Sequence, residues 1–233
     1  AGKRVLIDAA TSRAKVADML EARGIAELNL VIATHAHADH IGGMNQVLGS
    51  VPVKLYGDQG MPHTTRTYEH LMEQVESSGL RYLSLRAGRV FSLDDGIRIE
   101  ILAPTTSLLR GTRSDLNSNS VVARLTHGDN CFLFTGDAEE PTEQFLIEAG
   151  VGPCNVLKVA HHGSEHSTTA AWLAAVQPTL ALISCGANNR YGHPAPRTLE
   201  RLRAAGAEVH RTDLEGTLKV TSDGRRVSFE TVD

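Results

Sequence analysis

Three histidines and an aspartate fall within six positions near the start of the chain: His35, His37, Asp39 and His40. They follow a short apolar run, residues 28–34, that is typical of a buried strand. In an extended segment, residues two apart share one face, so His35 and His37 can bind one cation together. Asp39 and His40 come after the chain turns and can serve a second cation. Imidazole combined with carboxylate suits zinc, manganese or iron, and so constrained a pattern disfavours a histidine-rich surface turn.

Two later apolar runs also end in residues of ligand type. Residues 132–134 lead into a Thr-Gly-Asp turn that ends at Asp137, whose two carboxylate oxygens could bridge two cations. Residues 157–160 lead into His161 and His162. One of these histidines should complete the second cation's ligand shell, and the other should orient the substrate or act as an acid. Continuity with the strand favours His161 as the ligand.

A fourth polar segment, residues 188–194, follows the apolar run 180–184. It contains a cation, a phenol, two amides and an imidazole, a mixture that suits holding a phosphate and protonating a leaving oxygen. A plain surface loop is the alternative interpretation. The expected substrate-binding residues are Asn189, Arg190, Tyr191 and, near a predicted helix start where backbone amides favour anions, Ser164. The expected catalytic residues are Asp39, His162 and His193.

Composition excludes some classes of protein. The 233 residues carry a formal charge of −4 and have a pI near 6.3, which argues against a protein that coats DNA but not against an enzyme that grips phosphate locally. No apolar run approaches the roughly 18 residues of a membrane span, so we expect no membrane contact within this segment. Three cysteines without a CxxC spacing predict no disulfide framework.

The apolar pattern predicts one domain, residues 1–233, in which strands and helices alternate. The predicted helices span residues 14–23, 41–48, 64–78, 141–148, 168–176 and 196–205. The predicted strands span residues 5–7, 28–34, 53–56, 81–85, 97–102, 120–126, 131–135, 156–160, 180–184, 208–210, 216–221 and 227–230. We interpret the polar helix at 64–78 as an excursion from the core. This rhythm favours an α/β fold, an αββα sandwich of two mixed β-sheets flanked by helices.

Together these motifs resemble the metallo-β-lactamase superfamily, from about Val5 to Leu218. The runs at 161–164, 188–194 and 210–213 resemble one branch, the hydrolase domain of ComEC-type DNA-uptake competence proteins or a free-standing relative. The resemblance implies two divalent metal ions (Zn or Mn) and hydrolysis by a metal-activated water. In that branch it implies a nuclease that degrades the non-transported DNA strand, with an extracytoplasmic location; a relative outside the branch would be cytoplasmic or secreted.

Two departures from the superfamily pattern argue against lactam hydrolysis. The stretch 116–120 holds no histidine where β-lactamases carry one, and Ser184 and Cys185 replace a late histidine. The leading hypothesis is therefore a phosphodiesterase or nuclease in which Asp39, His40 and Asp137 position the water and the substrate is a nucleic acid or another phosphodiester. One alternative is hydrolysis of a small ester, lactone or β-lactam on the same centre. Another is a metal-stabilised binding domain.

Overall fold

The short apolar runs near the N-terminus form a four-stranded sheet. Its strands lie in the order β1 (Val5–Ile7), β2 (Leu30–Ile32), β3 (Tyr56–Asp58) and β4 (Tyr82–Ser84). Every pairing is parallel, so this sheet differs from the mixed sheet expected there. The structure, a computed structural model, describes residues 2–94 and 96–232. This sheet belongs to the first of two compact units, Ala1–Arg86.

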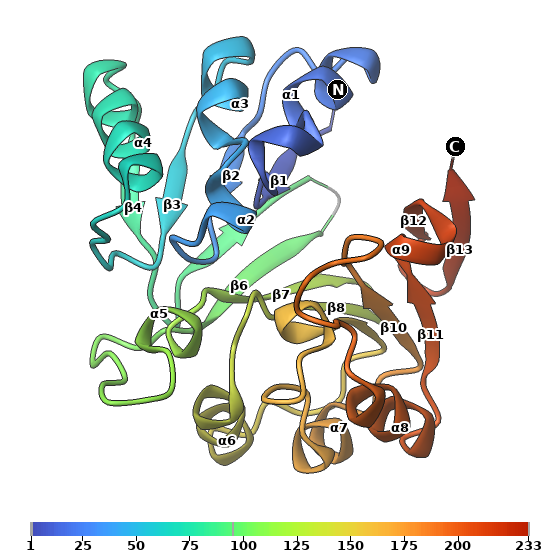
Figure 1. Cartoon of the computed structure of the whole chain (residues 1–233). Helices are drawn as coiled ribbons and strands as arrows, with labels where there is room; N and C mark the ends of the chain where they lie inside the picture. Colours follow the sequence, from blue (N-terminus) through green and yellow to red (C-terminus); the bar gives the residue numbers. More distant parts are fainter. Residues whose placement is uncertain (1, 95, 233) are drawn as a thin grey trace. The chain divides into compact units, whose positions relative to one another are not determined.

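Helices follow the strands of the first unit, as a parallel sheet requires. They include α1 (Val16–Ala22), α3 (Met44–Ser50) and α4 (Arg66–Ser77). Figure 1 shows these three helices on the same side of the sheet. The expectation that residues 64–78 leave the core is wrong, because Leu71 and Val75 of α4 are buried and α4 packs against α3. Most polar residues of α4 are exposed, and Gln74 instead faces α3, where it exchanges hydrogen bonds with Asn45.

The predicted helix at 41–48 is two helices. Helix α2 (Ala38–Ile41) already contains Asp39 and His40, and the chain breaks at Gly42 before α3 begins. A Cβ at Gly42 would lie 2.4 Å from the Ala38 carbonyl oxygen, and one at Gly43 would lie 2.4 Å from the Ala9 carbonyl oxygen. This close approach packs the loop after β1 directly beneath α2.

A seven-stranded mixed sheet forms the second unit, Ala87–Asp233. Its strand order is β11 (Glu208–Arg211), β10 (Leu180–Ile183), β9 (Val156–Lys158), β8 (Asn130–Phe134), β7 (Val122–His127), β6 (Arg98–Ala103) and β5 (Val90–Ser92). The four strands from β8 to β11 are parallel, and the other pairings are antiparallel. The carboxyl ends of β8, β9 and β10 therefore share one edge, where the predicted site residues follow.

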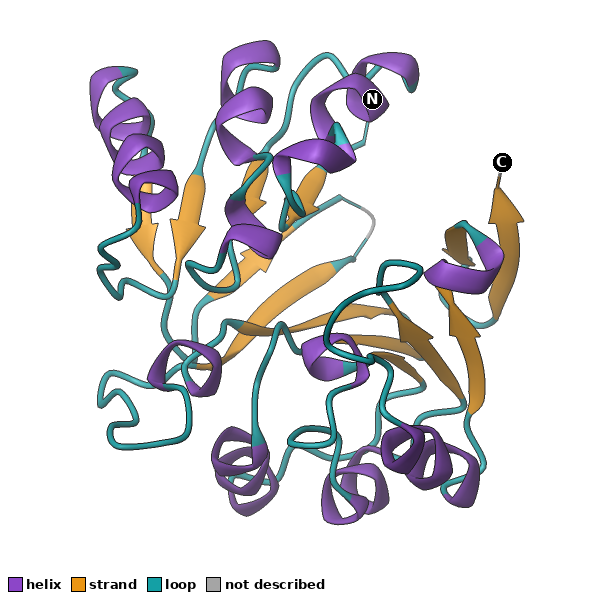
Figure 2. Ribbon diagram, viewed as in Figure 1, coloured by secondary structure: helices purple, strands orange, loops and turns teal. Residues whose placement is uncertain are grey.

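One face of this sheet carries the core of the second unit. Figure 2 shows α6 (Glu140–Glu148), α7 (Ala170–Val176) and α8 (Pro196–Ala204) along that face. Trp172 of α7, Leu157 of β9 and Leu202 of α8 belong to one buried apolar cluster. Within residues 2–94 and 96–232, no helix has the length and apolar character needed to cross a membrane.

A disulfide joins Cys131 to Cys154, which corrects the expectation of no disulfide. Strands β8 and β9 pair with Phe132 opposite Val156. This register brings the residues just before them together, and the two cysteine Cα atoms lie 4.9 Å apart. The number and spacing of the cysteines could not reveal this pairing, because it depends on strand register. Cys185 is the free cysteine.

The C-terminal strands β12 (Thr217–Ser222) and β13 (Val227–Val232) form a separate antiparallel pair. His210 of β11 stacks on Phe229 of β13, with ring centroids 3.7 Å apart. The same imidazole contacts Glu215 at 2.7 Å and Glu208 at 3.0 Å. Partial burial lowers the pKa of His210, but the two glutamates outweigh burial and the net pKa is raised. The hydrogen bond from His210 lowers the pKa of Glu215.

We expect the stability contributed by His210 to depend on pH. Because the folded-state pKa of His210 is raised, its contribution is complete below the unfolded-state pKa of about 6.5. The contribution is lost as the pH rises through the folded-state pKa. Because the folded-state pKa of Glu215 is lowered, the contribution of this carboxylate to unfolding free energy is complete above its unfolded-state pKa of about 4.3. The loss of unfolding free energy in His210→Gln should therefore be greatest between about pH 4.3 and 6.5 and shrink above it. Denaturant titrations from pH 4.5 to 8.5 measure this loss, with His70→Gln, an exposed histidine of α4, as the control. A loss that does not change with pH would contradict the expectation.

Candidate metal-binding site

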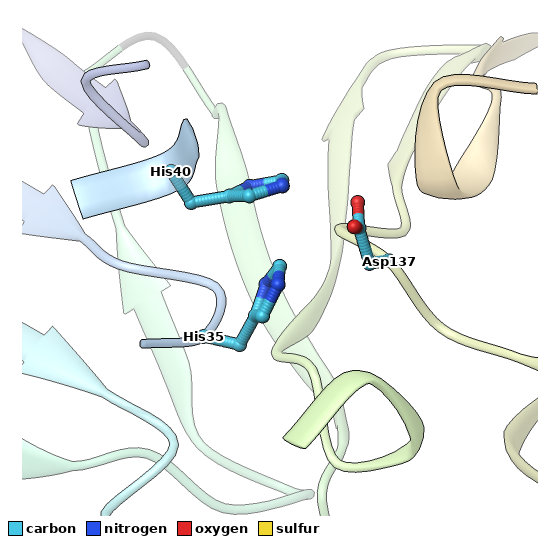
Figure 3. A group of neighbouring side chains, drawn as sticks. All are labelled: His35, His40 and Asp137. Carbon is cyan, nitrogen blue, oxygen red and sulfur yellow. The ribbon is translucent and has the colours of Figure 1, made fainter. Parts of the chain in front are cut away.

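The turn after β2 brings together the histidines of the first motif. His35 Nε2 lies 2.9 Å from His37 Nδ1, and the ring centroids of His35 and His40 lie 4.1 Å apart. His35 and His40 are buried, whereas Asp39 is exposed on the first turn of α2. Figure 3 shows how His35 and His40 project from this turn and from α2. The first unit thus places three imidazoles of the predicted set side by side.

Asp8, which lies outside the predicted site residues, orients this histidine group. The Asp8 carboxylate accepts hydrogen bonds from the Thr34 backbone N–H, from the Thr34 hydroxyl and, at 2.7 Å, from Nδ1 of His40. Donation through Nδ1 fixes the tautomer of His40, so that its Nε2 carries the lone pair. A carboxylate behind a histidine is the arrangement that prepares an imidazole to bind a metal ion. The signal in the sequence is an acidic residue directly after β1, beside the strand that carries the motif.

In the second unit, Asp137 faces two imidazoles. It follows β8 and is buried, and His161 and His162 follow β9. The Nε2 atom of His161 lies 3.6 Å from Asp137 Oδ2, and that of His162 lies 3.7 Å from Asp137 Oδ1. Each carboxylate oxygen therefore faces a different histidine. The left-handed backbone of both histidines, with φ of 50° and 55°, directs two successive side chains to the same carboxylate.

A hydrogen bond fixes the tautomer of His162, and burial shifts the pKa of His161. Nδ1 of His162 donates to the Ser184 carbonyl oxygen at 2.7 Å, because a carbonyl can only accept. Nε2 of neutral His162 then carries the lone pair on the side of Asp137. Burial lowers the pKa of His161 despite the nearby Asp137 and Glu139 carboxylates. A lowered pKa favours the neutral form of His161 that binds metal ions, and Nε2 of His162 faces Asp137, so both histidines qualify as ligands. Both histidines therefore remain candidate ligands, although continuity with the strand favours His161.

Polar residues outside the predicted site set surround His161 and Asp137. Glu139 is buried and lies 3.6 Å from Nδ1 of His161, and the amide of Asn117 lies 3.5 Å from the same nitrogen. The Ser120 hydroxyl accepts a hydrogen bond from the Asp137 backbone N–H. Asn117 and Ser120 belong to the stretch that holds no histidine. That stretch therefore contacts the Asp137 backbone and the His161 ring.

Cys185, at the position of the missing late histidine, is hydrogen-bonded to a carboxylate. Its thiol donates to Asp213 Oδ1 at 3.2 Å, and Asp213 in turn pairs with Arg211. Burial and the Asp213 carboxylate raise the pKa of the Cys185 thiol to about 11. These contacts favour the protonated thiol. Cys185 connects the end of β10 to the chain after β11.

The loop 186–193 carries Asn189, Arg190, Tyr191 and His193, and it places His193 beside His161. The Asn189 side chain spans this loop, donating to the Gly186 and His193 carbonyls and accepting from the His193 N–H. The ring centroid of His193 lies 5.6 Å from that of His161. Arg190 and Tyr191 are exposed at the loop tip. The structure thus places His193 near the donor atoms and Asn189 in the framework of the loop.

Ser164 lies inside the turn that follows the two histidines. It is 2% exposed, and its hydroxyl accepts a hydrogen bond from the His166 N–H. Its backbone carbonyl accepts from Thr198 of α8. These contacts hold the turn in place, and substrate contact by Ser164 stays a prediction.

The donor atoms fit a divalent cation in their chemistry and spacing. Zinc bonds to nitrogen and oxygen are about 2.1 Å long, so two ligands at a tetrahedral angle lie about 3.4 Å apart. The separations of 3.6 and 3.7 Å from the Asp137 oxygens to the two imidazoles are close to this value and exceed ordinary hydrogen-bond lengths. In the first unit, the 2.9 Å contact of His35 and His37 would open slightly to admit a cation.

A protein-family model decides the classification. The model described as the metallo-beta-lactamase superfamily matches residues 1–187. The chain belongs to this superfamily. Membership supports a metal-dependent hydrolase and confirms the superfamily suggested by the sequence motifs.

Two curated proteins are similar to this chain over most of its length. The chain is 32% identical to ComE operon protein 3 of Bacillus subtilis over 90% of its length, which is 26% of that protein. It is 31% identical to the competence protein ComA of Neisseria gonorrhoeae over 94% of its length, or 29% of that protein. The chain therefore spans between a quarter and a third of the length of these relatives.

Solved structures share the fold. CmlA, a diiron β-hydroxylase from Streptomyces venezuelae, aligns with 89% of this chain and 45% of its own, with a TM-score of 0.55 and 11% sequence identity. At this identity the likeness concerns the fold alone. It confirms the predicted fold class.

Proposed function

We propose that this chain is a divalent-metal-dependent phosphodiesterase that acts on DNA, as a nuclease. The observation that carries the proposal is Asp137, whose two carboxylate oxygens each face a different imidazole. Similarity to competence proteins supports nucleic acid as the substrate. Two divalent ions, zinc or manganese, would be held by His35, His37, Asp39, His40, Asp137 and His161, with His162 as a further candidate ligand beside Asp137. When bound, such ions lower the pKa of water and offset charge on the reacting oxygens of a phosphodiester.

The side chains of this protein have separate roles in the proposed reaction. Asp8 accepts the hydrogen bond from Nδ1 of His40 and so fixes both the tautomer and the orientation of that imidazole. Asp39 and Asp137 position the attacking water. Arg190 binds a phosphate oxygen at the exposed loop tip. The hydrogen bond from His162 to the Ser184 carbonyl suits a ligand better than an acid, so we assign the proton for the leaving oxygen to His193.

The hydrolysis test uses protein stripped with a chelator and then supplied with manganese or zinc. We expect cleavage of single-stranded DNA and of bis(p-nitrophenyl) phosphate only after a cation is added. His37→Ala should lower this rate at least about 100-fold, because the loss of one residue that merely supports a ligand already weakens metal binding 10- to 100-fold. His70→Ala is the control, since His70 is an exposed histidine of α4.

The same panel separates the alternatives. Turnover of nitrocefin, a lactone or a thioester with inert phosphodiesters would favour the small-ester or lactam hydrolase. Full metal loading without turnover of any ester would favour a metal-stabilised binding domain. No cleavage with any divalent ion, together with a His37→Ala variant that behaves like wild type, would refute the proposed activity.

We also propose an extracytoplasmic location. The Cys131–Cys154 disulfide supports it, because disulfides persist in oxidising compartments and are rare in the cytosol. Thiol titration of protein isolated from cells without reductant should find one free thiol per chain, that of Cys185.

A further inference from the structure

Tyr191 is an exposed aromatic residue beside a partly buried histidine group. Its side chain is 63% exposed at the tip of the loop 186–193. The neighbouring His193 lies 5.6 Å from His161, measured between ring centroids. Exposed aromatic rings provide stacking surfaces for flat ligands such as nucleobases.

The Tyr191 ring is part of an ordered stack of three side chains, Arg190, Tyr191 and His193, which we call the aromatic stack. The rings of Tyr191 and His193 are nearly parallel, with an interplanar angle of 20° and centroids 5.8 Å apart. The guanidinium carbon of Arg190 lies 4.8 Å from the Tyr191 centroid, and its Nη2 donates to the tyrosine hydroxyl at 2.6 Å. The stack therefore combines flat π surfaces with a positive charge.

Two contacts hold the aromatic stack in its place. The side chain of Asn189 ties the two ends of the loop together. At its far end, Pro194 packs so tightly on Gly163 that a Cβ at residue 163 would lie 2.5 Å from the proline Cβ. Gly163 follows His162 directly, so the loop that carries the stack is locked to the turn that carries the two histidines. A preformed site of this kind binds without a large ordering cost.

We propose that the aromatic stack binds one unpaired nucleobase of a DNA strand, next to the phosphodiester that is cleaved. This inference rests on the proposed function and narrows its substrate to single-stranded DNA or an unpaired end. Every base has a π face, so stacking on tyrosine is tolerant of sequence, and Arg190 adds attraction for the adjacent phosphate. A base within a duplex is already stacked on its neighbours, and leaving them costs free energy.

The test is a binding measurement in the presence of a chelator, so that no cleavage occurs. Fluorescence anisotropy follows the full chain binding to a labelled oligothymidylate and to a chain of the same length made only of abasic sites. Tyr191→Ala should weaken oligothymidylate binding about tenfold, the effect expected for losing one stacked base. It should leave abasic-chain binding unchanged. Tyr191→Phe, which keeps the ring and loses the hydroxyl contact to Arg190, should stay within about twofold of wild type, since stacking carries the affinity.

Val90→Ala supplies the matched control, because Val90 is an exposed apolar residue of β5 at the opposite edge of the same sheet. Wild type should also prefer oligothymidylate to a blunt duplex, and Tyr191→Ala should lose that preference. Equal weakening of both single strands by Tyr191→Ala, or no weakening, would overturn the proposal, as would absence of oligothymidylate binding to wild type. Failure of the proposed function would appear separately, as an absence of phosphodiester hydrolysis in the metal-supplemented assay.

Discussion

Asp137→Ala should abolish metal-dependent hydrolysis and weaken metal binding at least about 100-fold. Loss of a residue that only supports a ligand already costs 10- to 100-fold in metal affinity, and Asp137 is expected to be a ligand itself. Its two oxygens lie 3.6 and 3.7 Å from the Nε2 atoms of His161 and His162. Removing the carboxylate leaves the two imidazoles with no negative charge between them to attract a cation. Metal content after desalting, measured by mass spectrometry, and metal-induced shifts in melting temperature report the loss without relying on activity.

Two further variants decide whether the effect of Asp137→Ala is specific. Asp137→Asn keeps the side-chain shape and one oxygen, that of the amide carbonyl. This variant should therefore retain more metal than Asp137→Ala and less than wild type. Asp129→Ala removes an exposed carboxylate from the turn between β7 and β8 and should bind metal normally. Full metal retention by Asp137→Ala would exclude Asp137 as a ligand. Unfolding of Asp137→Ala at room temperature would move the decision to Asp137→Asn.

The site residues that sequence could predict share a simple origin. Asp137, His161 and His162 each follow an apolar run, and parallel strands bring the residues at their carboxyl ends to one edge of the sheet. Type, order and distance from the strand end therefore sufficed to predict that they lie together. The same reasoning located β2 and the histidine turn that follows it.

Other features depend on contacts that one-dimensional patterns do not encode. The break between α2 and α3 arises because Gly42 and Gly43 pack against backbone carbonyls, one of them from the loop after β1. The Cys131–Cys154 disulfide follows from the register of β8 against β9. The prediction that α4 lies outside the core is wrong because most of its residues are polar and only a short apolar stripe is buried.

Residues that support a ligand are the hardest to find, since they touch the ligand from another part of the chain. Glu139 and Asn117 lie beside His161 and are separated from it by 22 and 44 positions. Neither belongs to a spacing pattern of its own. Their assignment depends on burial and on the nitrogen they approach, which only the folded chain provides.

Asp8 provides the sharpest test of such a supporting role. Asp8→Asn should weaken metal binding about 10- to 100-fold although Asp8 is not among the expected ligands. The asparagine can still accept the hydrogen bond from the Thr34 N–H, but its amide nitrogen cannot accept from Nδ1 of His40. His40 is then free to adopt either tautomer, and the form that carries its proton on Nε2 cannot bind a cation.

Three comparisons separate this positioning role from a role in stability alone. Asp8→Ala leaves the Thr34 N–H without its partner and should cost about 1–3 kcal/mol of unfolding free energy, whereas Asp8→Asn should cost less. Thr34→Val removes the hydroxyl that donates to Asp8 and keeps the contact of Asp8 with His40, so it should lower stability more than metal affinity. Asp18→Asn, an exposed carboxylate of α1, is the matched control.

The nitrogen chemical shifts of His40 measure the tautomer directly. In wild type we expect a protonated Nδ1 and a lone pair on Nε2, and in Asp8→Asn a mixture of the two forms. Metal affinity should fall in proportion to the fraction of His40 that carries its proton on Nε2. Unchanged shifts together with unchanged metal affinity in Asp8→Asn would show that Asp8 only stabilises the turn, and would leave the orientation of His40 to Thr34, whose hydroxyl lies 3.3 Å from the same nitrogen.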